Sequence, residues 1–261
     1  MKIDIKDIED IKYAKSLLES ENFAIKTTSI IGKPIESGLN ILPNGVNDLI
    51  LNATTKALEV SLKTAVTTLS KKQSIFSSDN IHKLACATVG GTGGFFGLSA
   101  LAVELPFSTT IMLRSIADIA HSEGANINTT ETALECMSVF AFGGPLIEND
   151  TMDSGYYATR IALAETIKNA TKYITKEGLK KEAAPIVVKL ITEISSKFGI
   201  QVSQKITAQA IPVVGAVSGA LLNTIFIDHF QDKARGHFII KRLEKKYSID
   251  LVKEEYSKCL V

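Results

Sequence analysis

The chain has 261 residues, of which 29 are basic, 28 are acidic and 45% are hydrophobic, and this composition predicts a folded protein with a buried core. A net charge of +1 and the absence of tryptophan argue against a nucleic-acid partner, which needs a basic surface that usually carries stacking aromatic rings. The three cysteines, Cys86, Cys136 and Cys259, form neither a CxxC pair nor a disulfide framework, so a reducing compartment is expected. The N-terminal residues are charged and lack the apolar core of a secretory signal, so we expect a cytoplasmic protein with no signal peptide.

Helical periodicity dominates the sequence from its first residues onward. Apolar residues recur at steps of three and four over Ile5–Leu18 and again over Val46–Leu69, which predicts two amphipathic helices. Further along the chain, Asn128 with Glu131 is typical of a capping box and predicts the start of a helix that reaches Phe142.

Prolines and glycines mark further helix ends. Pro106 and Pro185 suit the first turn of a helix, whereas Gly124, Gly178 and Gly199 suit its end. No segment alternates polar and apolar residues over six positions, and no Asn-Gly or Asp-Gly turn joins two β-rich runs. The fold is therefore predicted to be all-α, a compact multi-helix bundle. Residues 1–73 are predicted to form an N-terminal amphipathic helical segment and residues 74–261 a helical domain, with no low-complexity linker between them.

Two long runs carry no charge. Leu84–Val103 has 20 residues and Ile206–Ile227 has 22, which is about the length that spans a bilayer. Pairs of glycines spaced four apart let helix backbones approach closely; these pairs are Gly90–Gly94, Gly93–Gly97 and Gly215–Gly219. The runs are predicted to form two glycine-rich central helices, which either pack against each other in the core or insert in or against a membrane. The glycine spacing within residues 91–97 does not predict a dinucleotide site, because no strand precedes it.

Side chains in and beside these runs are candidates for ligand binding. Phe95 and Phe96 either enter the core or face an acyl chain. Glu104 suits the N-terminal end of a helix, where negative charge is stabilised, and with Arg114 and Asp118 it is also a candidate for gripping a polar head group. The complete set of ligand-binding candidates is Gly93, Gly94, Phe95, Phe96, Gly97, Glu104, Arg114, Asp118, Gly215, Gly219 and Asn223.

Charge is segregated along the chain. Residues 1–83 carry 11 basic and 10 acidic residues, residues 84–158 carry 1 and 8, and residues 159–261 carry 17 and 10. Parts of opposite charge either dock against each other or leave a cationic face for a partner. One predicted helix face in the basic part carries a column of lysines, namely Lys168, Lys172, Lys176 and Lys180. This lysine column is either a solvated stripe or a surface that attracts anionic lipid.

Enzymatic motifs are weak. Two carboxylate-x-x-His pairs have the spacing found in di-iron helical bundles, namely Asp79 with His82 and Asp118 with His121, but no distinctive bridging glutamates accompany them. His229, Lys233 and His237 share one face of a C-terminal helix, a spacing more typical of a half-buried polar stripe than of a catalytic set. Neither a G-x-S-x-G elbow nor a Walker A motif occurs. The expectation is a protein without catalytic residues, cofactor or bound metal.

Two blocks of the sequence, Gly91–Gly124 and Ile211–Asp250, resemble the EcsC family of bacterial proteins. The first block holds the glycine cluster and E-L-P followed by L-R-S-I-A; the second holds P-V-V-G-A, a nearby Asn223, and a terminal H-F with R-L-E. The resemblance implies a helical protein. The family is named for a gene beside an ABC-transporter ATPase and its membrane subunit, and its role is often suggested to concern membranes or lipids. It supplies no established catalytic residues.

These observations together predict a non-catalytic helical protein that binds lipid or associates peripherally with the membrane. Its glycine-rich helices would hold an apolar ligand or a bilayer surface, and its lysine column would face anionic head groups. One alternative is an accessory module of an ABC-type export machine, with transporter subunits as partners. A second alternative is a metal-dependent helical enzyme.

Overall fold

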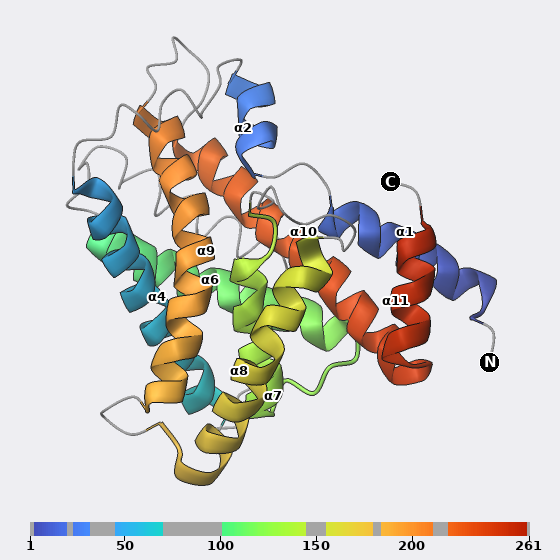
Figure 1. The fold of residues 1–261 in the computed structure, drawn as a ribbon. Helices are drawn as coiled ribbons and strands as arrows, with labels where there is room; N and C mark the ends of the chain where they lie inside the picture. The colour runs from blue at the N-terminus through green and yellow to red at the C-terminus, as the bar shows by residue number, and fades with distance from the viewer. Residues whose placement is uncertain are drawn as a thin grey trace.

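The computed structural model describes residues 3–19, 23–31, 45–69, 101–144, 155–179, 184–210 and 219–259. Every regular element in these ranges is a helix (Figure 1). The elements are α1 (Ile5–Leu18), α2 (Phe23–Ile31), α4 (Val46–Leu69), α6 (Leu101–Ser122), α7 (Thr130–Ser138), the 3-10 turn η2 (Val139–Ala141), α8 (Gly155–Glu177), α9 (Pro185–Ala210), α10 (Gly219–Lys246) and α11 (Ile249–Lys258). The predicted all-α bundle is confirmed for this part of the chain.

Helix α10 lies at the centre of the packing and contacts α1, α2, α6, α9 and α11 (Figure 1). Its Phe226 and Phe230 meet rings from other elements edge to face. The ring centroid of Phe226 is 5.0 Å from that of Phe23 in α2, and that of Phe230 is 5.2 Å from Phe140 in η2 and 5.5 Å from Phe198 in α9. Such pairs add to the stability gained from burial alone. This aromatic cluster joins four elements that are distant in the sequence.

Helix α1 is held on the bundle by residues from α10 and α11. The ammonium group of Lys233 donates hydrogen bonds to the carbonyl oxygens of Leu17 (2.8 Å) and Leu18 (2.9 Å), which belong to the last turn of α1 and lack a partner within the helix. In the other direction, Lys15 of α1 donates to the carbonyl oxygen of Tyr256 in α11 (3.2 Å). Helix α1 is therefore tied through its backbone as well as its side chains.

Several predicted helix boundaries are confirmed. Helices α1 and α4 have the bounds that the apolar periodicity indicated. Pro185 is the first residue of α9. Gly124 and Gly178 follow the ends of α6 and α8 with φ of +82° and +70°, a conformation that glycine adopts without the cost that a Cβ atom imposes.

Two predicted boundaries are wrong. Gly199 does not end a helix but lies inside α9, where a Cβ atom would meet only ordinary contacts with α4. Helix α9 continues through it because packing on both sides outweighs the weak helix propensity of one glycine. Pro106 lies in the second turn of α6 rather than the first, since α6 already begins at Leu101. A proline near the N-terminal end removes a single backbone bond, which a long packed helix tolerates.

The start of α7 is one residue later than predicted. Thr129 rather than Asn128 caps the helix, and its hydroxyl oxygen accepts a hydrogen bond from the backbone N–H of Thr132 (3.2 Å). The backbone N–H of Asn128 instead donates to the side chain of Asn126 (3.1 Å), which forms a turn just before the helix.

The end of this helical segment also differs from the prediction. Helix α7 tightens into η2, and Phe142 is already extended. The side-chain amide of Gln201 in α9 donates to the carbonyl oxygens of Phe140 (3.3 Å) and Phe142 (3.2 Å). A buried side chain thus satisfies the carbonyl groups that the ending helix leaves without partners.

Candidate functional site

An ion pair joins the first turn of α6 to α9. The ammonium group of Lys205 lies 3.5 Å from a carboxylate oxygen of Glu104, and their side chains are only 7% and 15% exposed. The same ammonium group lies 5.2 Å from the ring centroid of Phe226 in α10, within the range of a cation–π interaction. Three helices therefore meet at this pair. Because both charges are largely shielded from water, loss of either one would leave its partner uncompensated.

The pair stands at the boundary of both uncharged runs. Val103, the last residue of the first run, directly precedes Glu104, and Ile206, the first residue of the second run, directly follows Lys205. The described parts of the second run belong to two helices: residues 206–210 end α9, and residues 219–227 begin α10. We refer to the Glu104–Lys205 pair with Phe226 as the run junction. It brings one end of each run to a single place in the fold.

Six of the eleven predicted ligand-binding residues lie outside the described residues. Gly93, Gly94, Phe95, Phe96, Gly97 and Gly215 belong to that group. Gly219 is the first residue of α10. Asn223 is buried in the same helix, three residues before Phe226, and so lies on the face of α10 that turns toward the run junction.

Arg114 and Asp118 do not join Glu104. All three belong to α6, but Arg114 is ten residues beyond Glu104, a rise of about 15 Å along a straight helix. The structure forms no ion pair between Arg114 and Asp118 among the residues it describes, although they are four apart. The orientation of the two charges is the less favourable one for a helix. The sequence predicted one head-group site formed by Glu104, Arg114 and Asp118, but the rise of the helix separates Glu104 from the other two.

The lysine column is exposed but distant from the run junction. Lys168, Lys172 and Lys176 all face solvent on α8, whereas Lys180 lies outside the described residues. Helix α8 ends next to the start of α9, to which it is linked by residues 178–184 (Figure 1). Lys205 is twenty residues along α9, about 30 Å from that start.

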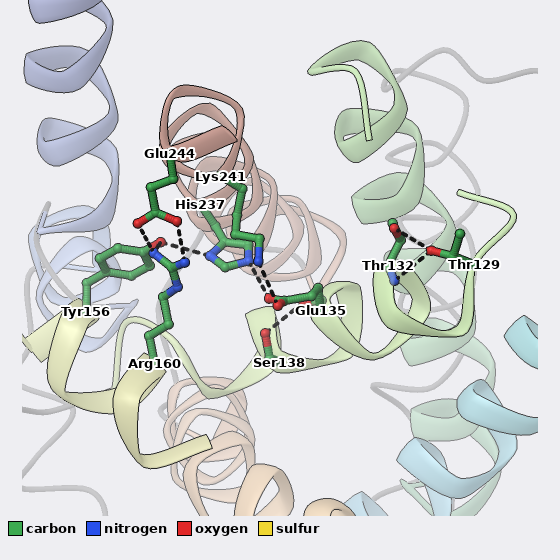
Figure 2. A network of polar contacts seen from close by, with 9 residues as sticks. All are labelled: Thr129, Thr132, Glu135, Ser138, Tyr156, Arg160, His237, Lys241 and Glu244. Atoms are coloured by element: carbon green, nitrogen blue, oxygen red, sulfur yellow. Dashed lines mark hydrogen bonds and ion pairs between the residues drawn. The ribbon is translucent and has the colours of Figure 1, made fainter. Parts of the chain in front are cut away.

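A second set of polar side chains is buried where α7, α8 and α10 meet, and Figure 2 shows it at close range. The two ring nitrogens of His237 bind different partners: Nδ1 lies 2.9 Å from the hydroxyl of Tyr156, and Nε2 lies 3.0 Å from a carboxylate oxygen of Glu135. Lys241, one turn further along α10, donates to the other oxygen of Glu135 (3.0 Å). We call this chain of contacts the buried relay.

The relay continues into α8. The guanidinium group of Arg160 donates to both carboxylate oxygens of Glu244, at 2.6 and 2.5 Å, which is the bidentate geometry of a strong charge-assisted pair. It also donates to the hydroxyl oxygen of Tyr156 (3.4 Å). Figure 2 shows Arg160 and Tyr156 approaching α10 from the same side.

The protonation states in the relay follow from burial and partners. Burial raises the pKa of Tyr156 far above its ordinary value, so its hydroxyl keeps the proton and donates it to Nδ1 of His237. Burial also lowers the pKa of His237, which is neutral and carries its proton on Nε2, toward Glu135. Burial alone would raise the pKa of Glu135, but the hydrogen bond from His237 and the nearby ammonium group of Lys241 lower it to about 2. Each polar side chain of the relay thereby has a hydrogen-bond partner.

The relay and the run junction together explain the segregated charge. Glu104, Glu123 and Glu135 all belong to the acidic middle of the chain, and each pairs with a cation of the basic C-terminal part. Arg242 is the partner of Glu123, at 3.0 Å. The two oppositely charged parts therefore dock against each other at these acids, and the lysine column remains as an exposed basic surface.

The sequence identified only part of the relay. His237 was recognised as belonging to a polar stripe on one helix face, but its partners Glu135 and Tyr156 were missed, as was Arg160, which binds Tyr156 and Glu244. Those partners come from other helices, and periodicity describes only the helix on which it occurs. A usable signal existed in the family resemblance, because the H-F and R-L-E motifs contain His237 and Glu244.

The proposed metal pairs gain no further ligands. Among the residues that the structure describes, no three His, Cys, Asp or Glu side chains gather at a distance that would hold a metal ion. Asp79 and His82 lie outside these residues, and His121 is exposed near the end of α6. None of the helices in the described ranges combines the length and the apolar character that crossing a bilayer requires.

The fold and these sites define a class of helical protein. In this class, several helices surround one long helix, and charged side chains from the surrounding helices pair with buried polar side chains of the long one. The chain belongs to the EcsC protein family, whose profile matches residues 6–243. The match begins within α1 and thus includes most of the predicted N-terminal segment, residues 1–73. No curated protein and no solved structure matches the chain.

Proposed function

We propose that the protein binds membrane lipid and associates with the membrane surface through the region of the two uncharged runs. The observation that carries this proposal is the run junction, because the ion pair of Glu104 and Lys205 brings one end of each run to one place. The two runs are 20 and 22 residues long and carry no charge, which is the length and apolar character that contact with lipid chains requires.

Exposed apolar side chains on α6 and α10, the helices that carry Glu104 and Phe226, support the proposal. Phe107, three residues beyond Glu104 on α6, is 53% exposed. Leu221, in the first turn of α10, is 39% exposed. Each leaves a large apolar surface in water that contact with lipid would cover, at a gain of about 25 cal/mol per Å² of apolar area.

Flotation with lipid vesicles tests the proposal. The full chain is mixed with vesicles of phosphatidylcholine alone or of phosphatidylcholine with phosphatidylglycerol, and the floated fraction is measured. The wild type is expected to float. The double variant Phe107→Ser with Leu221→Ser is expected to float less, because it removes exposed apolar surface from α6 and α10.

Ile249→Ser is the matched control. Ile249 is 59% exposed, much like Phe107, but lies on α11, away from the run junction (Figure 1). This variant should float like the wild type. If the wild type floats with neither vesicle and carries no lipid when extracted for mass spectrometry, lipid binding is excluded. Flotation only with native membranes that contain ABC-transporter subunits would favour the accessory-module alternative instead.

The lysine column is tested separately, because it lies far from the junction. Replacing Lys168, Lys172 and Lys176 by glutamine should weaken flotation with the anionic vesicles alone, since each lysine near an anionic surface contributes about 1 kcal/mol. Glutamine at three lysines elsewhere, Lys6, Lys56 and Lys63, removes the same charge from other exposed positions. Equal loss in both triple variants would show that only net charge matters.

A further inference from the structure

A small pocket lies between α4, α6 and α7, and none of its lining residues belongs to the run junction or the relay. Its volume is about 50 Å³. Leu113, Ala133 and Cys136 are buried in its wall, and Ala65, Ala117 and Ile127 are further apolar lining residues. Burial raises the pKa of the Cys136 thiol, so this group stays protonated and presents an uncharged wall.

The hydroxyl groups of the pocket are already engaged within the protein. The threonines of the wall each have an intramolecular hydrogen bond. Thr64 donates to the carbonyl oxygen of Val60 (2.8 Å), and Thr110 donates to that of Pro106 (2.8 Å). The hydroxyl oxygen of Thr132 accepts a hydrogen bond from the hydroxyl of Thr129 (2.9 Å). Ser61 is paired with Thr110 at 3.1 Å. A bound molecule therefore meets mainly methyl and methylene groups along the wall.

Arg114 is the exception. Its side chain lines the pocket and is exposed to solvent. No hydrogen bond or ion pair joins it to any residue in the described ranges. A guanidinium group has five N–H donors in a planar fork, which matches the two oxygens of a carboxylate. The pocket thus combines an apolar interior with a cation whose donors are unused.

The volume limits the size of the apolar part. One water-sized group needs about 10–15 Å³ of such space, so the pocket holds roughly three to five groups of this size. We propose that the pocket binds a straight-chain carboxylate, with a stem of about three carbons inside and its carboxylate on Arg114. This site is distinct from the run junction, because Arg114 lies ten residues beyond Glu104 on α6, and the two proposals fail independently.

The test uses methyl NMR of the full chain, labelled at alanine and isoleucine methyl groups. Titration with butanoate should shift the signals of Ala117, Ile127 and Ala133 in a saturable manner. Butan-1-ol lacks the charge-assisted hydrogen bonds to Arg114, and inorganic phosphate lacks the apolar stem that the pocket buries, so each should bind at least about tenfold more weakly than butanoate. Phosphate that binds as well as butanoate would overturn the proposal.

Variants assign the binding to the pocket. Arg114→Gln should weaken butanoate binding about tenfold or more, since it removes the charged fork. Lys63→Gln should leave it unchanged, because Lys63 is an exposed cation beside Thr64 that does not line the pocket. Ala117→Leu should abolish binding by filling the space. Equal affinity in wild type and Arg114→Gln overturns the proposal even if Ala117→Leu fails to fold.

A longer acid distinguishes the sources of the ligand. Decanoate has the same head group and a chain that must extend out of the pocket. Binding of decanoate with the same dependence on Arg114 supports the proposal and points to fatty acids released from lipid. Binding of butanoate alone supports it and points to a small metabolite. Absence of saturable shifts with both acids overturns it.

Discussion

The hydroxyl of Tyr156 and Nδ1 of His237 lie 2.9 Å apart, although 81 residues separate the two in the sequence. This contact joins α8 to α10, and Glu135 on the other ring nitrogen adds α7. Three helices are thereby fixed in one relative position by one imidazole ring. Apolar packing tolerates small shifts, whereas hydrogen bonds between buried groups do not.

Tyr156→Phe should lower the free energy of unfolding by about 1–3 kcal/mol, because Nδ1 of His237 loses its donor in a buried site. Urea denaturation measures the change. Tyr13→Phe is the control: Tyr13 is 51% exposed, and its hydroxyl has no hydrogen bond to the described residues. The control should change the free energy of unfolding by less than about 0.5 kcal/mol. Equal effects in the two variants would mean that the relay contributes nothing to stability.

Acid should remove the contribution of Glu135. Its pKa falls from an ordinary 4.5 to about 2 in the folded protein, so the folded state binds fewer protons than the unfolded state between these values. The stabilisation is therefore complete above pH 4.5 and is lost as the pH falls toward 2, in total about 3 kcal/mol. The variant Glu135→Gln lacks this carboxylate. The difference in the free energy of unfolding between the wild type and the variant should therefore become smaller as the pH falls from 4.5 to 2. Glu131→Gln, at an exposed position on the same helix, should show no such trend in urea denaturation.

High pH should change the contribution of Lys233 to the free energy of unfolding. Burial lowers the pKa of Lys233 from 10.5 to about 8, so between these values the unfolded state holds the proton more firmly. The stability that Lys233 contributes should therefore rise with pH from 8 to 10.5, by up to about 3 kcal/mol. The comparison is between wild type and Lys233→Met, measured by urea denaturation at each pH. Lys12→Met, at an exposed position on α1, is expected to give a constant difference, and a constant difference for Lys233→Met would contradict the prediction.

Two glycines inside helices should respond to alanine in opposite ways. A Cβ atom on Gly236 would lie 2.6 Å from Cγ of Leu18 and 2.9 Å from the carbonyl oxygen of Ala14, so α1 and α10 would have to separate. Gly236→Ala should destabilise the protein by about 1–3 kcal/mol. At Gly199 the nearest atom is Cδ1 of Leu51, at 3.9 Å, and Gly199→Ala should stabilise it by about 0.5–1 kcal/mol through helix propensity. Thermal denaturation of both variants tests these expectations. If Gly236→Ala is as stable as the wild type, α1 and α10 do not cross closely at this glycine.

The sequence predicted what depends on one helix and missed what depends on two. Helices α1 and α4 were found because their apolar residues repeat at the helical period, and that period is a local property. Glu104 was a candidate for head-group binding, but its partner Lys205 was not identified, because 101 residues separate them in the sequence. The opposite charges at the boundaries of the two runs were the available signal. That these two charges pair with each other became visible only in the three-dimensional structure.

The same distinction explains the glycines. Gly124 and Gly178 follow helix ends with positive φ, a conformation that glycine itself permits, so the residue type is a local signal. Gly199 carries an identical local signal but lies against α4, and tertiary packing continues the helix through it. A close backbone approach was predicted at Gly94 and Gly219; in the described residues such an approach occurs at Gly236.

The attachment of α1 also orders events during synthesis. Lys15 is translated 241 residues before its partner Tyr256, and Leu17 is translated 216 residues before Lys233. Contacts between such distant residues form late and slow the folding of a chain. Helix α1 therefore leaves the ribosome early with its apolar face uncovered, and this face is available to chaperones until α10 and α11 have emerged.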